Sequence, residues 1–268
     1  MPTRQMNSFL RWAGSKRKLL PVLLDLVPKD FERYVEPFAG SACLFFTLQP
    51  RRAVLGDIND ELINAYREVR RSPKEVIDGL SELDPNKENY YRVRAINPSE
   101  LNGPHRAARF IYLNRLCFNG LYRTNKRGEF NVPFGGYRCG PIPSDECLRL
   151  SAAFLRRASL ISGSFERTLE RTKTGDFVYL DPPYCIRSRR VFNEYSHFSF
   201  GADQLISLRQ HLDRLDHMGV PFLVSYGLSR EARELAKGFR YREVIVQRQI
   251  AGFSAKRRKN RELLITNY

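Results

Sequence analysis

A strand that runs into a glycine turn and then a helix is the feature of this sequence that most restricts its fold. Residues 34–42 read Tyr-Val-Glu-Pro-Phe-Ala-Gly-Ser-Ala, which predicts a strand and a tight turn before a helix at 43–48. A second predicted strand, 53–57, follows directly. The succession of strand, helix and strand predicts an α/β domain built on a doubly wound sheet.

The turn and the end of the second strand together indicate a cofactor site. Gly40 lets a ligand approach the backbone closely, and Asp57 lies seventeen positions further on. An acid near this position can accept hydrogen bonds from both ribose hydroxyls of an adenosine cofactor. Ala42 replaces the second glycine of a dinucleotide-binding motif and no basic phosphate reader follows, which favours a cofactor without a pyrophosphate. The alternative is a turn that serves packing alone.

The sequence Asp181-Pro182-Pro183-Tyr184 follows the apolar run 177–180 and is suited to holding an exocyclic amine. An adenine or cytosine amino nitrogen is a poor nucleophile because its lone pair is delocalised into the ring. The Asp181 carboxylate and the Pro182 carbonyl can accept hydrogen bonds from both amino protons, and Tyr184 offers a flat face to the base. The two prolines stiffen the turn and remove two N–H donors. The alternative is a rigid turn after a buried strand.

A third segment, Phe9 to Lys16, contains the single tryptophan of the chain, Trp12. The face of an indole ring suits a sulfonium cation or an adenine, and a lysine suits a carboxylate or a phosphate. The alternative is an N-terminal segment whose tryptophan packs on the core.

In their order along the chain, 9–16, 34–42 and 181–184, the three segments resemble the motifs of the Dam-like, D12 class of site-specific DNA adenine-N6 methyltransferases. Residues 112–135 resemble the target-recognition hairpin of that family and 261–265 its last strand, so the likeness covers nearly the whole chain. It implies an α/β, Rossmann-like S-adenosylmethionine-dependent methyltransferase fold with an inserted, mostly helical target-recognition domain that carries a β-hairpin. The implied catalytic domain comprises 1–60 and 144–268, the insertion 61–143, and the hairpin about 118–137.

The resemblance also implies roles for individual residues. The methyl donor is S-adenosylmethionine, which becomes S-adenosylhomocysteine, and no metal is needed. The implied catalytic residues are Asp181, Pro182 and Tyr184. The implied cofactor-binding residues are Trp12, Lys16, Phe38, Gly40, Asp57, Phe165 and Asp181. The implied DNA-binding residues are Arg11, Asn119, Tyr122, Arg123 and Asn125, together with Lys256, Arg257 and Arg258 of the basic loop 252–261.

Arginine and asparagine side chains in the hairpin suit base recognition. Arg123 can fork onto guanine, Asn119 and Asn125 can bond adenine edges, and Tyr122 or Phe118 can wedge into the base stack. Packing or phosphate contact is an equal alternative for each, and the basic loop can equally be a solvated charge run.

Two departures from the family pattern leave the target sequence open. Arg11 stands where a lysine commonly precedes the tryptophan, and Gly136 stands where an arginine often precedes Tyr137. The site GATC is therefore one candidate, and a longer or different GAT-containing site is another.

The composition indicates a polyanionic partner. The chain has 268 residues, with 45 Lys and Arg against 29 Asp and Glu, which gives a formal charge of +16. Such an excess fits DNA or RNA better than an acidic membrane. No stretch approaches the ~20 apolar residues that span a bilayer, and residues 1–7 lack a signal-peptide apolar region. We therefore expect a protein of the cytoplasm, associated with the nucleoid, that binds double-stranded DNA and no membrane.

The five cysteines contain no CxxC pair, and the four histidines show no HExxH spacing. We expect neither a metal site nor a structural disulfide. Cys185 adjoins the Asp-Pro-Pro-Tyr turn, but direct methylation of an amine needs no covalent enzyme intermediate, so we expect a small, tolerated side chain there.

Further periodicity predicts the remaining elements. The family resemblance implies that residues 164–166 form a turn beside the cofactor adenine, whereas a phenylalanine after a strand is by itself more often a core residue. Helices are expected at 60–71, 106–116, 144–157 and 205–215, and strands at 158–162, 221–225, 244–249 and 263–267.

Other functions share some of these features. An RNA adenine-N6 methyltransferase would have the same cofactor turn and the same charge, although residues 112–135 resemble a duplex-DNA reader. The sequence is also compatible with a catalytically inactive DNA-binding regulator that has a methyltransferase fold, and with an N4-cytosine enzyme. A monomer suffices for one methyl transfer to one strand. Restriction protection beside a separately acting endonuclease, repair marking and phage modification all fit as roles.

Overall fold

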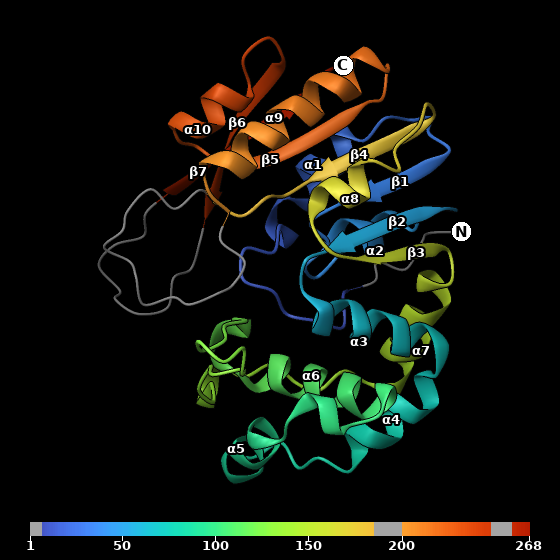
Figure 1. Ribbon diagram of the computed structural model, residues 1–268, viewed down its shortest axis with the longest axis vertical. Coiled ribbons are helices and arrows are strands. Elements are labelled where there is room, and N and C mark those ends of the chain that lie inside the picture. The colour runs from blue at the N-terminus through green and yellow to red at the C-terminus, as the bar shows by residue number, and fades with distance from the viewer. Residues whose placement is uncertain (1–6, 185–199, 248–258) are drawn as a thin grey trace.

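The computed structural model describes residues 7–184, 200–247 and 259–268, and within them seven strands form one sheet (Figure 1). The strand order across the sheet is β3-β2-β1-β4-β5-β7-β6. Strands β1 to β5 run parallel, and β7 is antiparallel to both of its neighbours. The strands are β1 (Arg33–Glu36), β2 (Ala53–Asp57), β3 (Ala158–Ser162), β4 (Asp176–Leu180), β5 (Phe222–Gly227), β6 (Arg240–Gln247) and β7 (Lys259–Thr266).

The strand order reverses between β1 and β4. From β1 the sheet grows through β2 to β3 on one side, and from β4 it grows through β5 on the other. In doubly wound sheets ligands bind at this switch point, beyond the carboxyl ends of the strands, because the connections diverge there and leave a crevice. Glu36 ends β1, and Asp181 directly follows β4. The fold therefore places both acids where a ligand is expected.

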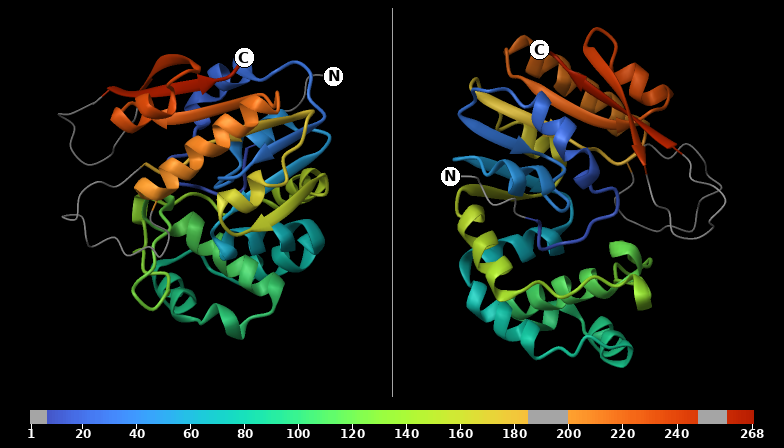
Figure 2. Two further views of the ribbon diagram at one scale, coloured as in Figure 1. Left: turned by 45° about the horizontal axis from the view of Figure 1, so that its top comes forward. Right: turned by 180° about the vertical axis from the view of Figure 1, so that it is seen from behind.

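Alternate side chains of the central strands pack into two hydrophobic layers. In β1, Tyr34 belongs to the layer of helices α1 and α2, whereas Val35 belongs to that of α8, α9 and α10. Figures 1 and 2 show these two groups of helices on opposite faces of the sheet. Covered faces explain why β4 is buried along its whole length. These helices are α1 (Leu20–Leu26), α2 (Cys43–Leu48), α8 (Phe165–Leu169), α9 (Ala202–His217) and α10 (Arg230–Leu235).

Helices between β2 and β3 include the segment predicted as an insertion, and they lie below the sheet in Figure 1. Their buried side chains, such as Tyr66 and Ile111, share one hydrophobic cluster with Tyr34 of the sheet. The insertion therefore has no separate core. The last of these helices packs against both α3 and α4, so the division of the chain near residue 144 stays a prediction. The helices are α3 (Asp60–Arg71), α4 (Pro73–Ser81), α5 (Lys87–Ala95), α6 (Gly103–Leu116) and α7 (Asp145–Leu155).

Four of the inserted helices begin with a side-chain cap. Asn59, Asn86, Asn102 and Ser144 each accept a hydrogen bond from the backbone N–H three residues further on. Such a cap satisfies one of the unpaired N–H groups of a helix start and contributes about 1 kcal/mol. The cap at Asn102 also explains why α6 begins at Gly103, before the start predicted at 106.

The segment predicted as a hairpin, 118–137, folds back on itself without forming regular strands. Asn119 and Gly136 have φ values of 56° and 57°, and short 3-10 turns form around each of them. A positive φ interrupts the extended conformation that strand pairing needs. Antiparallel contact is limited to two isolated bridges, Cys117 to Phe134 and Thr124 to Phe130.

The other differences from the predicted elements lie near the C-terminal end and at residue 165. Strand β6 begins at residue 240, ahead of the predicted 244, because the side chains of 240–243 are exposed on an edge strand and show no apolar alternation. Strand β7 likewise begins at 259, ahead of 263. Phe165 is the first residue of the short helix α8 and does not lie in a turn. None of the described helices is long and apolar enough to cross a membrane.

Candidate active site

A cavity of about 830 Å³ opens at the carboxyl ends of β1, β2 and β4. Its walls come from the segment before α1, the glycine turn, the loop after β2, the start of α8 and the turn after β4. We refer to it as the switch-point cavity. All the residues that the sequence predicts for catalysis or cofactor binding line it, namely Trp12, Lys16, Phe38, Gly40, Asp57, Phe165, Asp181, Pro182 and Tyr184.

The glycine turn exposes its backbone to this cavity. Gly40 adopts a φ of +46°, and its N–H donates to Asp57 Oδ2 at 2.9 Å. The indole ring of Trp12 lies close by, because a Cβ on residue 40 would stand 2.7 Å from Trp12 Cδ1. Both the backbone conformation and the neighbouring ring therefore require glycine at this position.

The carboxyl group of Asp57 is held by backbone donors on both oxygens. Oδ1 accepts from the N–H of Asn59 at 2.9 Å, and Oδ2 accepts from Gly40. Burial raises the pKa of Asp57 to about 6, although these donors favour the ionised form. A carboxylate has about four acceptor sites, so an ionised Asp57 can still accept from the hydroxyls of a ribose.

An aromatic wall stands next to this acid. The rings of Phe38 and Phe165 stack with centroids 5.1 Å apart and an interplanar angle of 27°, and the edge of Phe200 packs against Phe38 at 6.0 Å. An apolar wall suits the flat base of a nucleoside, and the neighbouring carboxylate suits its sugar. The residues present therefore fit an adenosine group.

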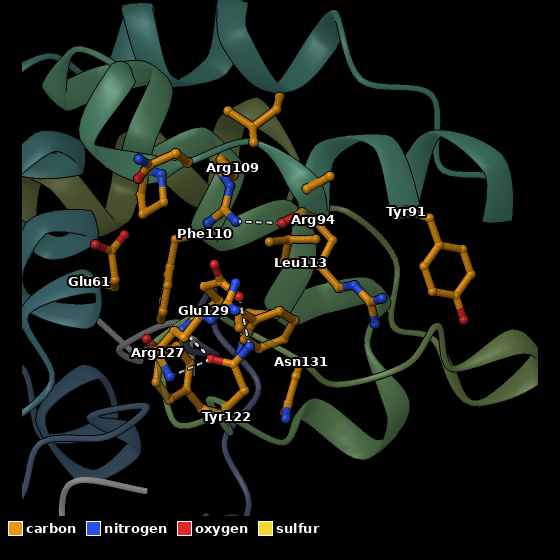
Figure 3. Close-up of a pocket in the computed structure, with 18 residues that line it drawn as sticks. Glu61, Tyr91, Arg94, Arg109, Phe110, Leu113, Tyr122, Arg127, Glu129 and Asn131 are labelled. Carbon is orange, nitrogen blue, oxygen red and sulfur yellow. Dashed lines mark hydrogen bonds between the residues drawn. The ribbon is translucent and has the colours of Figure 1, made fainter. Parts of the chain in front are cut away.

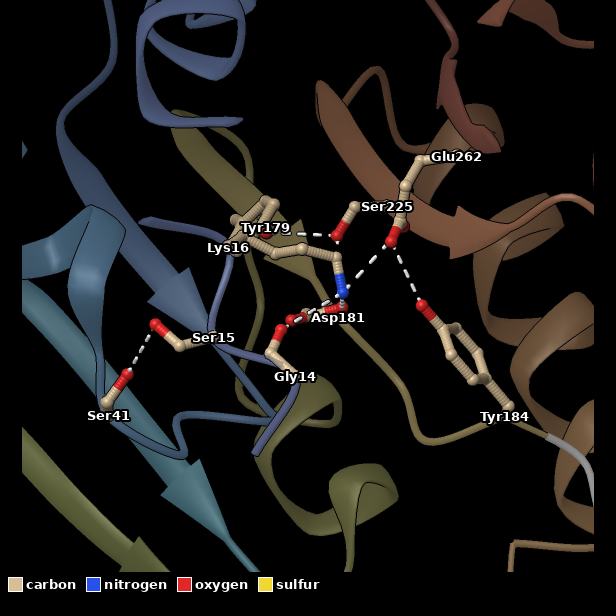
Figure 4. A network of polar contacts seen from close by, with 9 residues as sticks. All are labelled: Gly14, Ser15, Lys16, Ser41, Tyr179, Asp181, Tyr184, Ser225 and Glu262. Atoms are coloured by element: carbon tan, nitrogen blue, oxygen red, sulfur yellow. Dashed lines mark hydrogen bonds and ion pairs between the residues drawn. The ribbon is translucent and has the colours of Figure 1, made fainter. Parts of the chain in front are cut away.

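The carboxylate of Asp181 is fixed through one of its oxygens (Figure 4). Oδ1 accepts from Lys16 Nζ at 2.6 Å and from Ser225 Oγ at 3.1 Å. Ser225 Oγ is itself hydrogen-bonded to the hydroxyl of Tyr179 at 2.9 Å. The sequence predicts a carboxylate or phosphate partner for Lys16, and in the structure that partner is a protein carboxylate.

Lys16 is a buried cation between two acids. Its Nζ lies 3.7 Å from Glu262 Oε2 in addition to its contact with Asp181. Burial alone would lower the pKa of Lys16, but the two carboxylates raise the pKa above its usual value. Lys16 therefore stays charged over the whole working pH range and neutralises the acids beside it.

Tyr184 is held at its hydroxyl, and its side chain lines the cavity. The hydroxyl donates to Glu262 Oε1 at 3.0 Å, and the ring meets Tyr226 edge to face with centroids 5.4 Å apart. The side chain is 41% exposed and lines the switch-point cavity. A flat face is therefore available to a base next to Asp181.

A second cavity, of about 560 Å³, lies in the insertion beside α6 and the loop 122–131 (Figure 3). Tyr122 lines both cavities, and its ring stacks on Trp12 with an interplanar angle of 18°. Burial raises the pKa of Tyr122 to about 12, so its hydroxyl stays protonated. This aromatic stack joins the insertion to the predicted cofactor side of the switch-point cavity.

The predicted DNA-binding residues of the insertion lie on the loop beside the second cavity. Arg123 Nε donates to Asn131 Oδ1 at 2.9 Å, and Asn125 Nδ2 donates to Glu129 Oε2 at 2.7 Å. Asn119 is exposed in its own turn. Base recognition by these residues stays a prediction.

Arg11 ties the N-terminal segment to the insertion, and its Cβ lies against Gly120. Its Nη1 donates to the backbone carbonyls of Arg138 at 2.8 Å and Arg115 at 3.3 Å. The DNA contact that the family resemblance implies for Arg11 would require some of these bonds to be exchanged. The predicted phosphate-binding residues Lys256, Arg257 and Arg258, and also Cys185, lie outside the described residues.

Several polar residues of the site were not predicted from the sequence. Glu36 is 2% exposed, lines the cavity and accepts from the hydroxyl of Tyr34 at 3.0 Å. Burial raises the pKa of Glu36 well above its usual range. Glu262 is 1% exposed and Ser225 is fully buried. An acid inside an apolar strand was the available signal for Glu36 and Glu262, whereas Ser225 gave none.

The fold and the cavity define the class of this protein: a doubly wound α/β enzyme with an adenosine-compatible site and a carboxylate at the switch point. The chain belongs to the D12 class of N6 adenine-specific DNA methyltransferases, because the sequence profile of that family matches residues 12–250. It is therefore an enzyme that transfers a methyl group from S-adenosylmethionine to N6 of adenine in DNA. The family predicted from the three sequence motifs is confirmed.

Characterised relatives extend over almost the entire chain. The Type II methyltransferase M1.LlaDCHI of Lactococcus lactis subsp. cremoris is 36% identical, over 98% of this chain and 96% of its own. The Type II methyltransferase M.MjaIII of Methanocaldococcus jannaschii is 33% identical, over 98% of this chain and 100% of its own. The DNA adenine methylase of Escherichia coli strain K12 is 34% identical, over 97% of this chain and 95% of its own.

Proposed function

We propose that the switch-point cavity holds an adenine extruded from duplex DNA together with S-adenosylmethionine. The observation that carries the proposal is that Asp181 and the glycine turn line the same cavity. When bound, S-adenosylmethionine supplies a methyl group carried on a sulfonium. Extrusion of the base costs a few kcal/mol of lost stacking and pairing, which contacts with the protein offset.

The amine side of the proposal rests on Asp181, Pro182 and Tyr184. The carboxylate and the Pro182 carbonyl accept hydrogen bonds from the two N6 protons, which favours a nitrogen that is losing its planarity. Tyr184 stacks on the extruded ring and fixes its plane. N6 would gain the methyl group as the sulfonium becomes the neutral thioether of S-adenosylhomocysteine, and it would give up one amino proton to solvent water. Positioning by these three residues supplies most of the acceleration.

On the cofactor side, we propose that Asp57 accepts from the ribose hydroxyls and that Phe165 packs on the adenine ring. Phe38 and Gly40 form the adjoining wall. Trp12 and Lys16 bound the methionine end, where the indole face suits a sulfonium. The arrangement of these residues supports this assignment, since Trp12 lies close to Gly40 and Asp57 accepts from the N–H of the same glycine.

The affinity for S-adenosylmethionine is expected to fall as the pH drops through about 6. The pKa of Asp57 is raised to about 6, and donation from ribose hydroxyls requires the ionised carboxylate. Below that pH the carboxyl proton of Asp57 must leave when the cofactor binds. The dissociation constant of S-adenosylmethionine should therefore rise about tenfold for each unit by which the pH is lowered. Calorimetry between pH 5 and pH 8 measures this dissociation constant, which should not change with pH above pH 7.

The matched variant for this titration is Asp57→Asn, which keeps the shape of the side chain but cannot ionise. It should bind the cofactor more weakly at every pH and show no step near pH 6. A level profile for the unaltered enzyme between pH 5 and pH 7 would exclude Asp57 as the ribose acceptor.

We propose that the insertion is the target-recognition region and that the basic surface binds DNA phosphates. The charge of +16 supports this, as does Tyr122, which lies on the loop beside the second cavity and also lines the switch-point cavity. Arg123, Asn119 and Asn125 are the proposed base readers, and Tyr122 links them to the site through Trp12. Phosphate contacts position the duplex, and base contacts in the grooves supply sequence specificity.

For the target we propose a GAT-containing sequence. Gly136, at φ +57°, has no side chain for base contact, and the guanidinium of Arg11 is engaged with backbone carbonyls. The site is therefore either GATC or a sequence that differs from it at the positions those residues would read. The names of two relatives support restriction protection as the role, with an endonuclease that acts separately. A single chain contains all the proposed parts, so we propose a monomer acting on DNA in the cytoplasm.

Expression in a host without adenine methylation, followed by modification-aware sequencing of its DNA, tests this function. The expected result is N6-methyladenine in one GAT-containing motif, and none in cells that express Asp181→Ala to the same level. Methylation of cytosine N4, or tritiated methyl incorporated into ribosomal RNA and not into plasmid, would contradict the proposal.

A further inference from the structure

Glu262 is a buried acid that joins two parts of the switch-point cavity without lining it. It lies on β7, is 1% exposed, and is far in the sequence from every residue proposed for catalysis. Its Oε1 accepts from the hydroxyl of Tyr184 at 3.0 Å, and its Oε2 lies 3.7 Å from Lys16 Nζ. Burying a carboxylate costs free energy unless it is well paired. The buried position of Glu262 therefore indicates that this side chain holds its neighbours in position.

Lys16 carries the connection from Glu262 to Asp181. Its ammonium group lies 2.6 Å from Asp181 Oδ1 and 3.4 Å from the carbonyl oxygen of Gly14. It also lies 5.7 Å from the centroid of the Tyr184 ring. The ammonium is thus held from several directions, and the carboxylate bound to it has little freedom to rotate.

The two oxygens of Asp181 have different surroundings. Oδ1 accepts from both Lys16 and Ser225, whereas no donor among the residues that the structure describes bonds Oδ2. The side chain is 19% exposed at the wall of the cavity. Oδ1 therefore anchors the group, and Oδ2 remains as the acceptor for an incoming amine.

We propose that Glu262 is a positioning residue for methyl transfer, acting through Lys16 on the Asp181 carboxylate and through the hydroxyl of Tyr184 on the stacking ring. It thereby sets the distance between the amine acceptor and the surface that holds the base (Figure 4). The inference rests on the proposed function of Asp181 and Tyr184. A displacement of about 1 Å at a reacting centre can cost about 10²-fold in rate, which is why such a connection matters.

The test compares Glu262→Gln, Tyr184→Phe and the double variant in single-turnover methyl transfer with saturating DNA and S-adenosylmethionine. Glu262→Gln keeps the shape but removes the charge that holds Lys16, and Tyr184→Phe keeps the ring but removes the contact. We expect a rate decrease of about 10-fold to 100-fold for Glu262→Gln and of about 3-fold to 10-fold for Tyr184→Phe. Dissociation constants for both ligands should stay within about twofold.

Coupling between the rate losses of the two single variants is the result that a merely structural role of Glu262 would not give. Because the distance between Asp181 and Tyr184 is set only while both ends of the connection are held, either change releases it, and the double variant should be about as slow as the slower single variant. Rate losses that multiply, or a normal rate for Glu262→Gln, would overturn the proposal. Glu243→Gln on the neighbouring strand, which pairs with Arg261 and Arg233 outside the cavity, is the matched control and should keep the normal rate.

Two further measurements separate the possible failures. If Glu262→Gln lowers the melting temperature too far to be assayed, Tyr184→Phe leaves the buried acid in place, and a normal rate for that variant overturns the proposal by itself. Asp181→Ala is assayed in parallel. Full activity of Asp181→Ala would refute the proposed function, whereas an inactive Asp181→Ala beside a fully active Glu262→Gln would refute the positioning role alone.

Discussion

Replacement of Asp181 by alanine is expected to lower the single-turnover rate of methyl transfer by about 10³-fold or more. The variant loses the acceptor that holds the amine and favours its reactive geometry, and nothing else in the cavity replaces it. Duplex DNA should bind with nearly unchanged affinity, whereas S-adenosylmethionine, for which Asp181 is also a predicted contact, should bind more weakly. A quenched assay with a tritiated methyl group measures the rate, and calorimetry and fluorescence anisotropy measure the two affinities.

The fold should survive this change because Lys16 keeps its second counter-ion, Glu262, at 3.7 Å. The Asp181 side chain is also partly exposed, at 19%. Asp78→Ala, at an exposed acid on α4, is the control for an aspartate removed elsewhere and should be fully active. Loss of DNA binding and of the folded state together with activity would mark Asp181 as a residue of the fold.

Replacement of Lys16 by methionine should have the largest effect on stability. It leaves Asp181 and Glu262 facing each other with no cation between them, and removal of one partner from a buried ion pair costs about 3–5 kcal/mol. For a chain of this size we expect the melting temperature to fall by about 10 °C. Methyl transfer should also slow by about 10²-fold, since Asp181 loses its anchor.

The pH dependence of the Lys16 contribution follows from its raised pKa. A lysine whose pKa is higher in the folded state stabilises fully at every pH below its unfolded value of about 10.4, and the contribution is lost only above that pH. The difference in melting temperature should therefore be the same at pH 7 and pH 9. Lys18→Met, an exposed lysine in the same segment, should change stability by less than about 0.5 kcal/mol. A Lys16→Met enzyme as stable as Lys18→Met would contradict the buried pairing.

Much of the sheet could be predicted because its strands are buried on both faces. The predicted strands 53–57 and 158–162 coincide with β2 and β3, and the glycine turn leads into α2 at the predicted residue. Short apolar runs bounded by turn residues are typical of strands in parallel sheets. The resemblance placed Asp181 in both the catalytic and the cofactor-binding set, and in the structure both sets line one cavity, since the carboxyl ends of adjacent parallel strands meet at one edge.

The contacts that organise the site could not be predicted, because they join residues far apart in the sequence. Lys16 was expected to bind a ligand, and the structure pairs it with Asp181, 165 positions away. Ser225 lies inside a buried strand and has no local pattern that distinguishes it from a packing residue. The loop 118–137 does not form the regular strands of a hairpin, because positive φ values at two of its residues interrupt strand pairing. Composition alone does not reveal these backbone conformations.

A crystal structure of the enzyme with a duplex that contains its target site and a non-reactive analogue of S-adenosylmethionine tests the central claim most directly. The account predicts an extruded adenine with N6 within about 3.2 Å of an Asp181 carboxylate oxygen and of the Pro182 carbonyl, and the Tyr184 ring stacked on the base. An adenine bound in a different cavity, with Asp181 contacting protein groups alone, would contradict it.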